Sequence, residues 1–203
     1  GQGPAPGPAG TEDYERAVST GAPVLADPGR NDNDVYMLCT GGTTGLPKGV
    51  IWPHKALFMA ALGGGGIYFG RTPIQRPEEL ADLVPQGQPL AYLALAPMMH
   101  GAAMWASLIS LLAGHTVVVN AHPRFDAAQV WDIVQCEQVN ILSVVGDAMA
   151  LPLIQALEAE PQRWQLGALK IFGNGGAVFS PHLQDRLHAL LPQLAINNGM
   201  GSS

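Results

Sequence analysis

The sequence predicts an α/β fold, a mainly parallel sheet with flanking helices. From residue 90 onward, short apolar runs alternate with longer segments whose apolar residues recur at helical spacing. The apolar runs are continuous, as is typical of parallel strands buried on both faces. The chain has 203 residues and is 47% hydrophobic, enough to bury a sizeable core. Right-handed crossovers between such strands would gather the ligand-binding loops at the carboxyl ends of the strands.

The first 34 residues are expected to form a flexible lead-in with one short helix. Residues 1–10 are almost entirely Gly, Pro and Ala, a linker-like composition. A helix is predicted over 11–20, where Tyr14 and Val18 are one turn apart.

The next segment is predicted to contain a strand, a helix and a long connection. Residues 35–39 form a short apolar run, which indicates a strand. Residues 54–62 place apolar side chains at helical spacing. Residues 63–89 are rich in Gly, Pro and charge, which indicates a connection with one helical turn at 77–83.

The remaining elements alternate regularly. Helix ends are indicated by Gly114, by Asp126 with Gln129 as a capping box, and by Ser180 before Pro181. Strands are expected at 90–96, 116–119, 139–145, 168–172 and 194–196, and helices at 101–113, 126–136, 148–159 and from 180 onward. Pro152 would be tolerated near the first turn of its helix, and Asp147 is interpreted as that helix's cap.

The string "TGGTTGLPKG", residues 40–49, combines backbone freedom, hydroxyl groups and one cation. Glycines let the backbone approach a bulky ligand, and their free N–H groups form an anion-binding concavity. The pattern therefore predicts polyphosphate binding. It is not the common P-loop, because Pro47 stands where that motif needs Gly. No dinucleotide fingerprint and no G-x-S-x-G elbow of a serine hydrolase is present.

The charge and the cysteine content argue against some classes of function. The formal net charge is −6, and the ten basic residues are scattered, which argues against a nucleic-acid partner. Cys39 and Cys136 share no metal-like spacing, so two reduced thiols in a cytoplasmic protein are expected. No signal peptide is recognised, and no apolar run reaches the roughly 18 residues of a membrane span.

Residues 40–49 closely resemble the signature [ST]-[SG]-G-[ST]-T-G-x-P-K-G of the adenylate-forming enzymes: acyl- and aryl-CoA synthetases, luciferases and adenylation domains. Three further segments support the resemblance in family order: "LALAPMMHGAAMW", "FGNGGAVFSP" and "NNGMGSS". The residues of these segments are most similar to those of bacterial fatty-acid and steroid-acid CoA ligases.

The resemblance implies that a carboxylate attacks the α-phosphate of ATP, and that coenzyme A then takes the acyl group from acyl-AMP. It implies ATP, Mg²⁺ and coenzyme A for the full-length enzyme, and a fatty or steroid acid as substrate. The phosphates would contact Thr40, Gly41, Gly42, Thr43, Thr44, Gly45 and Lys48. The adenine and acyl group would contact Gly175, Gly176 and Ala177, and the nucleotide would further contact Asn198, Gly199, Met200, Gly201 and Ser202.

His100 and Ser203 are the residues to which the resemblance gives a catalytic role. His100 would border the reacting carboxylate, and Ser203 would keep the hydroxyl of the family's Thr. Met200 stands where the family usually has an aromatic residue that packs on adenine. Met104 is interpreted as helical core packing, whereas the loop of Met98 and Met99 stays open between core and acyl pocket.

The resemblance further implies a truncated sublobe of the large N-terminal domain. Residues 35–203 would be a partial AMP-binding domain without the Glu expected after Ser203, so the chain alone is expected to be inactive. Its low charge, 13% against about 25% for an average protein, suggests apolar faces through which it self-associates. Two alternatives stay open: a non-catalytic nucleotide-binding α/β module, and an adenylation domain that loads a carrier protein.

Overall fold

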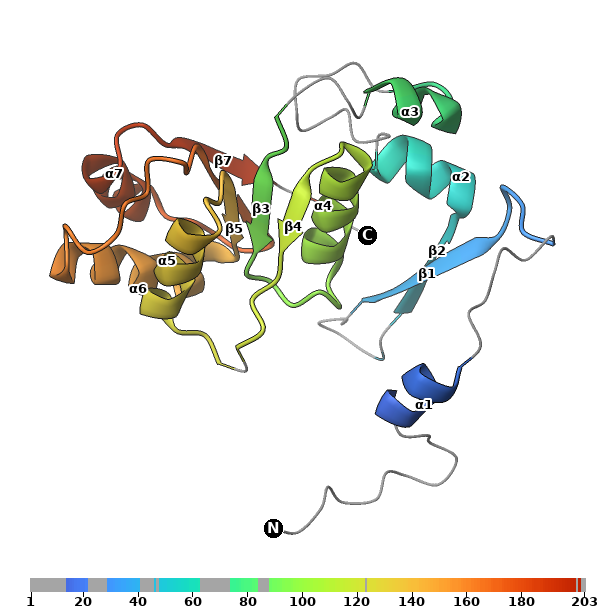
Figure 1. The fold of residues 1–203 in the computed structure, drawn as a ribbon, viewed down its shortest axis with the longest axis horizontal. Coiled ribbons are helices and arrows are strands. Elements are labelled where there is room, and N and C mark those ends of the chain that lie inside the picture. The colour runs from blue at the N-terminus through green and yellow to red at the C-terminus, as the bar shows by residue number, and fades with distance from the viewer. Residues whose placement is uncertain are drawn as a thin grey trace, which may run out of the picture.

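The computed structural model describes residues 14–21, 29–40, 46, 48–62, 74–83, 88–122, 124–199 and 201. Figure 1 shows two separate sheets with helices between and beside them. The strands are β1 (Val35–Thr40), β2 (Lys48–Pro53), β3 (Ala91–Ala94), β4 (Thr116–Val118), β5 (Ile141–Val144), β6 (Ile171–Gly175) and β7 (Ala195–Gly199). The helices are α1 (Tyr14–Thr20), α2 (His54–Ala56), the π-helix η1 (Leu57–Ala61), the 3₁₀ turn η3 (Pro77–Glu79), α3 (Leu80–Leu83), α4 (Gly101–Leu112), α5 (Ala127–Cys136), α6 (Gly146–Ala159) and α7 (Pro181–Leu190).

The larger sheet confirms the predicted α/β fold. Its five strands are all parallel and lie in the order β4-β3-β5-β6-β7. The chain runs from β3 outward to β4 and then returns past β3 to β5, so the direction of winding reverses between β3 and β5. Right-handed crossovers in opposite directions place their helices on opposite faces of a sheet. This is why α4 lies on one face while α5, α6 and α7 cover the other (Figure 1).

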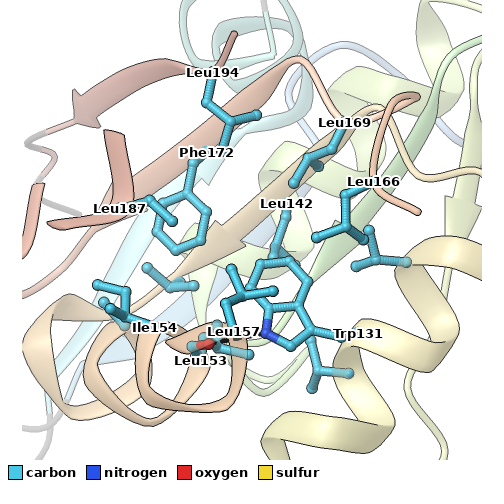
Figure 2. Close-up of a cluster of buried hydrophobic side chains, with 14 of the residues drawn as sticks. Trp131, Leu142, Leu153, Ile154, Leu157, Leu166, Leu169, Phe172, Leu187 and Leu194 are labelled. Carbon is cyan, nitrogen blue, oxygen red and sulfur yellow. Dashed lines mark hydrogen bonds between the residues drawn. The ribbon is translucent and has the colours of Figure 1, made fainter. Parts of the chain in front are cut away.

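The main core lies between the sheet and the helices α5, α6 and α7. Figure 2 shows Trp131 of α5 packed among Leu142 of β5, leucines of α6 and leucines of the segment before β6, with Phe172 of β6 close by. The indole N–H of Trp131 donates to the Leu153 carbonyl at 2.9 Å, so this large side chain is buried with its polar atom satisfied. The continuous apolar runs of the sequence thus become strands whose side chains fill this core.

The smaller sheet corrects one prediction. Residues 35–39 were expected to form a strand of the parallel sheet, and no second strand was expected between residues 40 and 53. Instead, β1 and β2 form an antiparallel hairpin with its own register, from Val35 opposite Pro53 to Thr40 opposite Lys48. The β2 segment escaped prediction because Pro47, Gly49 and Pro53 interrupt its apolar residues and resemble turn signals.

The helix predicted at 54–62 begins as expected at His54 but is mostly wound as the π-helix η1. The Leu62 N–H donates to the Leu57 carbonyl at 2.9 Å, the five-residue spacing of a π-turn. Leu57 and Leu62 are buried with Ile109 of α4 in a small second cluster. This cluster joins the hairpin and its following helix to α4.

Several helix-end predictions are confirmed. Gly114 has φ = 76°, the left-handed value expected after a helix. The Gln129 N–H donates to Asp126 Oδ1 at 3.0 Å, so Asp126 caps α5. Pro181 stands at the start of α7 as expected, but the Ser180 side chain makes no cap hydrogen bond, so that part of the prediction is wrong. The helix expected at 148–159 begins earlier, at Gly146, so Pro152 lies inside it.

Candidate functional site

The carboxyl ends of the parallel strands bring three predicted segments to one edge of the sheet. His100 follows β3, Gly175 ends β6, and Gly199 ends β7 opposite Gly175. The winding reverses between β3 and β5, and crevices at such a switch point are the usual ligand sites of open α/β sheets. The structure therefore places these predicted residues where the topology favours a ligand.

His100 is held by its backbone at the junction of loop and helix. Its N–H donates to the Pro97 carbonyl at 2.9 Å, and its own carbonyl accepts from the Ala103 and Met104 N–H groups that open α4. The side chain is exposed. An imidazole fixed at a helix start and facing solvent can serve as a hydrogen-bonding wall of the site.

The methionines near His100 differ in role. Met104 is half-buried, and its sulfur accepts a hydrogen bond from the Tyr36 hydroxyl of β1 at 3.8 Å, so it packs toward the hairpin. The Met98 sulfur accepts from the Ser107 hydroxyl at 3.7 Å, while Met99 is 79% exposed. Met98 thus turns back onto α4, and Met99 alone of the pair is largely free to meet a ligand.

The hairpin brings β1, the strand before the predicted phosphate-binding segment, next to α4. Thr40 and Lys48 face each other across the two strands, at the end where the chain turns. A Cβ added to Gly101 would stand 3.2 Å from Leu38 Cδ2, so β1 packs closely on the first residue of α4. Gly41, Gly42, Thr43, Thr44, Gly45 and Pro47 lie outside the described residues.

The loop after β6 is shaped by two left-handed glycines. Gly176 has φ = 82° and Gly146, at the start of α6, has φ = 60°. A Cβ on Gly146 would lie 2.7 Å from both the Ala177 Cβ and the Val178 carbonyl oxygen. Only glycine therefore lets α6 start against this loop without displacing it. Gly176 and Ala177 are exposed on top of it.

A buried asparagine organises this edge, and the sequence analysis missed it. Asn174 of β6 is 8% exposed. Its Oδ1 accepts from the Gly146 N–H at 2.7 Å, and its Nδ2 donates to the Ala177 carbonyl at 3.0 Å and to Asn198 Oδ1 at 3.2 Å. A polar amide inside the apolar run "KIFGNGG" is the signal that could have drawn attention to it.

Asp147 does not cap its own helix, contrary to the prediction. α6 begins at Gly146 with no side-chain cap, and Asp147 instead accepts the Ser180 N–H at 2.7 Å. This backbone hydrogen bond, followed by a smaller attraction to His182, lowers the pKa of Asp147 below its usual value. Asp147 thereby ties the start of α6 to the start of α7.

The last predicted segment is described only in part. Asn198 is exposed, and its amide donates to Gln184 Oε1 at 3.3 Å while its Oδ1 accepts from Asn174. Gly199 and Gly201 are exposed. Met200, Ser202 and Ser203 lie outside the described residues.

The hollow that the structure forms lies away from the carboxyl ends of the strands. A polar hollow of about 570 Å³ is lined by Gln135, Gln138, Arg163, Gln165, Gly167 and Ala168. These residues precede β5 and β6, so the hollow lies at the opposite, amino edge of the sheet. Arg163, its cation, is already paired with Glu160 at 2.8 Å. In the described part of the chain, no group of three or more His, Cys, Asp or Glu side chains could hold a metal.

No described helix is long and apolar enough to cross a bilayer.

The family model described as "AMP-binding enzyme" matches residues 4–203. The chain therefore belongs to the AMP-binding enzyme family, as the resemblance of residues 40–49 predicted.

Curated relatives are similar to this chain over most of its length. A 3-oxocholest-4-en-26-oate–CoA ligase of Rhodococcus rhodochrous is 36% identical over 195 residues, which are 94% of this chain and 35% of the relative. A medium/long-chain-fatty-acid–CoA/3-oxocholest-4-en-26-oate–CoA ligase of Mycobacterium marinum is 38% identical over 174 residues, 86% of this chain and 31% of the relative. The chain thus spans about a third of the length of these relatives.

Solved structures agree on the fold. The N-terminal domain of FACL13 from Mycobacterium tuberculosis superposes with a TM-score of 0.66 at 24% identity, over 93% of this chain and 42% of that one. The luciferase-like enzyme of the mealworm Zophobas morio gives a TM-score of 0.65 at 19% identity, over 86% of this chain and 36% of that one. At these identities the comparison establishes the α/β fold of the family.

Proposed function

We propose that the chain is part of an AMP-forming acyl-CoA synthetase that activates a fatty or steroid acid with ATP and transfers it to coenzyme A. The observation that carries this proposal is the similarity, at 34–38% identity, to relatives named as CoA ligases for such acids. Residues 35–203 would be the partial AMP-binding domain, with 1–34 as a lead-in, in a cytoplasmic enzyme. The gathering of the predicted residues at one edge of the sheet supports this function.

The hairpin would grip the phosphates of ATP. Thr40, at the end of β1, and Lys48, at the start of β2, stand opposite each other, and the glycines and threonines between them in the sequence would supply N–H and hydroxyl donors. Lys48 would add a positive charge against the leaving pyrophosphate. The described residues offer no carboxylate cluster for Mg²⁺, so no step is assigned to a metal bound by them.

The sheet edge would hold the other reactants. Gly175, Gly176 and Ala177 would lie along the adenine and the start of the acyl group, where absent or small side chains leave room. His100 would border the reacting carboxylate, and the Asn198–Ser203 segment would complete the nucleotide site. Such a site lowers the barrier by aligning the carboxylate with the α-phosphate and by stabilising developing charge.

Pyrophosphate exchange tests the proposal. The longer protein that contains this chain is expected to exchange labelled pyrophosphate into ATP only when a fatty or steroid acid is added, and to form the acyl-CoA. Exchange without acyl transfer to coenzyme A would favour carrier-protein loading. ATP binding without exchange would favour a non-catalytic module. The 203-residue chain alone is expected to give no exchange above background.

Two separate lysine substitutions test the predicted phosphate site, one at the site and one beside it as a control. Lys48→Ala should lower exchange by at least about tenfold, because it removes a charge from the phosphates. Lys55→Ala removes a neighbouring exposed lysine, paired with Asp32 at 3.3 Å, and should leave exchange unchanged. Equal effects of the two substitutions would count against the phosphate-binding hairpin.

Self-association of the isolated chain is a further part of the proposal. The outer face of the hairpin exposes Val35, Met37 and Ile51 at 57%, 56% and 60%. Because Met37 and Ile51 stand opposite each other, these side chains form one apolar surface suited to a second copy. Light scattering should show oligomers that Met37→Lys reduces; a wild-type monomer at high concentration would refute this.

A further inference from the structure

Asn174 connects three segments that the chain brings together at the carboxyl edge. The acceptor end of its amide receives the first N–H of α6, from Gly146, at 2.7 Å. The donor end reaches the Ala177 carbonyl at 3.0 Å and Asn198 Oδ1 at 3.2 Å. Because both ends of the amide are used, the orientation of this side chain is fixed by its neighbours.

The same segments are joined by two further bonds. The Asp147 N–H donates to the Val178 carbonyl at 2.9 Å, and the Ser180 N–H donates to Asp147 Oδ1 at 2.7 Å. The Gly146 and Asp147 N–H groups at the start of α6 are therefore bonded within the protein. These donors brace the loop 175–180 instead of facing a ligand.

We propose that Asn174 is a positioning residue for nucleotide binding, which holds the loop 175–177 and the Asn198 end of β7 at a fixed separation. This inference rests on the proposed function, because it takes the exposed backbone of Gly175–Ala177 to be what the nucleotide meets. Asn174 itself is buried beneath that loop and acts through it. Loss of the Asn174 hydrogen bonds should weaken ATP binding more than it slows the formation of acyl-AMP.

A matched asparagine lies at the opposite edge of the sheet. Asn140 Oδ1 accepts from the Ala91 N–H at 2.8 Å, and its Nδ2 donates to the Ala168 carbonyl at 3.0 Å. It bridges β3 to the segment before β6, as Asn174 bridges α6 to the loop after β6. The two side chains share one chemistry, but only Asn174 stands at the proposed nucleotide edge.

Asn174→Asp is the sharpest test, because it changes one donor into an acceptor at constant shape. The new carboxylate could still accept from Gly146, but its second oxygen would face the Ala177 carbonyl oxygen, another acceptor, across the 3.0 Å now spanned by a hydrogen bond. Protonation would restore a donor. This opposing carbonyl should raise the pKa of the introduced carboxyl above the ordinary value of about 3.9.

The experiment uses the longer protein that contains this chain and measures KM for ATP and kcat in pyrophosphate exchange from pH 5.5 to 8. Asn174→Asp should raise KM about fivefold or more at pH 8, the factor for one net hydrogen bond, with a smaller change in kcat. Its KM should fall back toward the wild-type value as the pH is lowered. Asn140→Asp should lower the melting temperature without this pH-dependent KM.

Three outcomes would overturn the inference: an unchanged KM in Asn174→Asp, equal KM shifts in the two variants, or no recovery at low pH. If Asn174→Asp does not fold, Asp147→Ala removes the acceptor of the Ser180 N–H and so loosens the same loop from its other side. It should raise KM in the same direction, and an unchanged KM there overturns the inference too. Absence of exchange in the wild-type protein would instead refute the proposed function. In that case, deuterium exchange tests the hydrogen bonds of Asn174 alone. In Asn174→Asp the Gly146 N–H should stay protected, because the carboxylate still accepts from it. The amides of Ala177 and Val178 should exchange faster, because the bond to the Ala177 carbonyl is lost.

Discussion

The parallel sheet and the hairpin are packed very differently. The sheet and α5–α7 share a large cluster that includes Trp131, Leu142 and Phe172, all fully buried. The hairpin touches a small cluster whose buried members, among the described residues, are Leu57, Leu62 and Ile109. Its outer face is exposed. The comparison indicates that the sheet carries most of the stability, while the hairpin is free to open locally.

The indole N–H groups of the tryptophans also differ between the two regions. The indole N–H of Trp131 in the sheet's core donates to the Leu153 carbonyl. Near the hairpin, Trp52 and Trp105 pack edge-to-face with ring centroids 5.7 Å apart, but neither buried indole N–H has a partner within the described part of the chain. An unsatisfied buried donor costs about 1–3 kcal/mol, so the hairpin cluster is also less favourable per side chain.

The largest expected effect is the loss of Phe172. Phe172→Ala should lower the free energy of unfolding of the chain by about 3–5 kcal/mol, because it empties a fully buried site beside Phe179. Urea unfolding would measure this, and hydrogen exchange should quicken throughout the parallel sheet, whose slowest amides exchange through global unfolding. Leu57→Ala, in the hairpin cluster, should quicken exchange only in β1 and β2. If the two substitutions quickened hydrogen exchange in the same set of amides, the division into a stable sheet and a locally opening hairpin would be contradicted.

A smaller effect is expected where the sheet meets its loops. Gly146→Ala forces a Cβ onto a residue with φ = 60° and against the Val178 carbonyl, so it should cost about 1–3 kcal/mol. Gly167→Ala is the control, because a Cβ there would meet nothing within 4 Å. Thermal unfolding of both variants would measure the difference. A neutral Gly146→Ala would show that the carboxyl edge is as adaptable as the hairpin.

The tryptophans give a more sensitive comparison. Trp131→Phe removes a satisfied indole and should cost at least about 1 kcal/mol. Trp52→Phe removes an indole N–H that lacks a partner among the described residues, so it should be nearly neutral or stabilising. Urea midpoints would rank the two. A larger loss from Trp52→Phe would mean that the hairpin is not the weaker region.

The fold was largely predictable from residue 90 onward because β3, β4 and β5 are apolar runs and a helix signal follows each of them. Asp126, Gly114 and Pro181 mark helix ends through local chemistry, which a sequence displays directly. The hairpin was not predicted, because β2 owes its pairing to β1 and α4 and not to its own pattern. The π-winding of Leu57–Ala61 likewise has no local signal.

The gathering of the site segments at the carboxyl ends of the strands was predicted in outline, but the order of the strands was not. His100, Gly175 and Gly199 were each found from motif resemblance, and the sheet topology was needed to show that β6 and β7 are neighbours, with Gly175 opposite Gly199. Asn174 was missed because its role depends on Gly146 and Asn198, which are 28 and 24 residues away. Asp147 was assigned to the wrong helix because α7, its actual partner, is distant in sequence.

The smallest expected effect is the pH dependence contributed by Asp147. The Ser180 N–H lowers the pKa of Asp147 in the folded state, so this carboxylate stabilises the fold above the unfolded pKa of about 3.9. That contribution is lost as the pH falls through the lower folded pKa. The urea midpoints of wild type and Asp147→Asn should therefore differ at pH 6 and converge below pH 4. Because Asp147 braces only the carboxyl edge, amide exchange in β1 and β2 should be the same in both proteins, and a matching change there would show that hairpin and sheet are coupled.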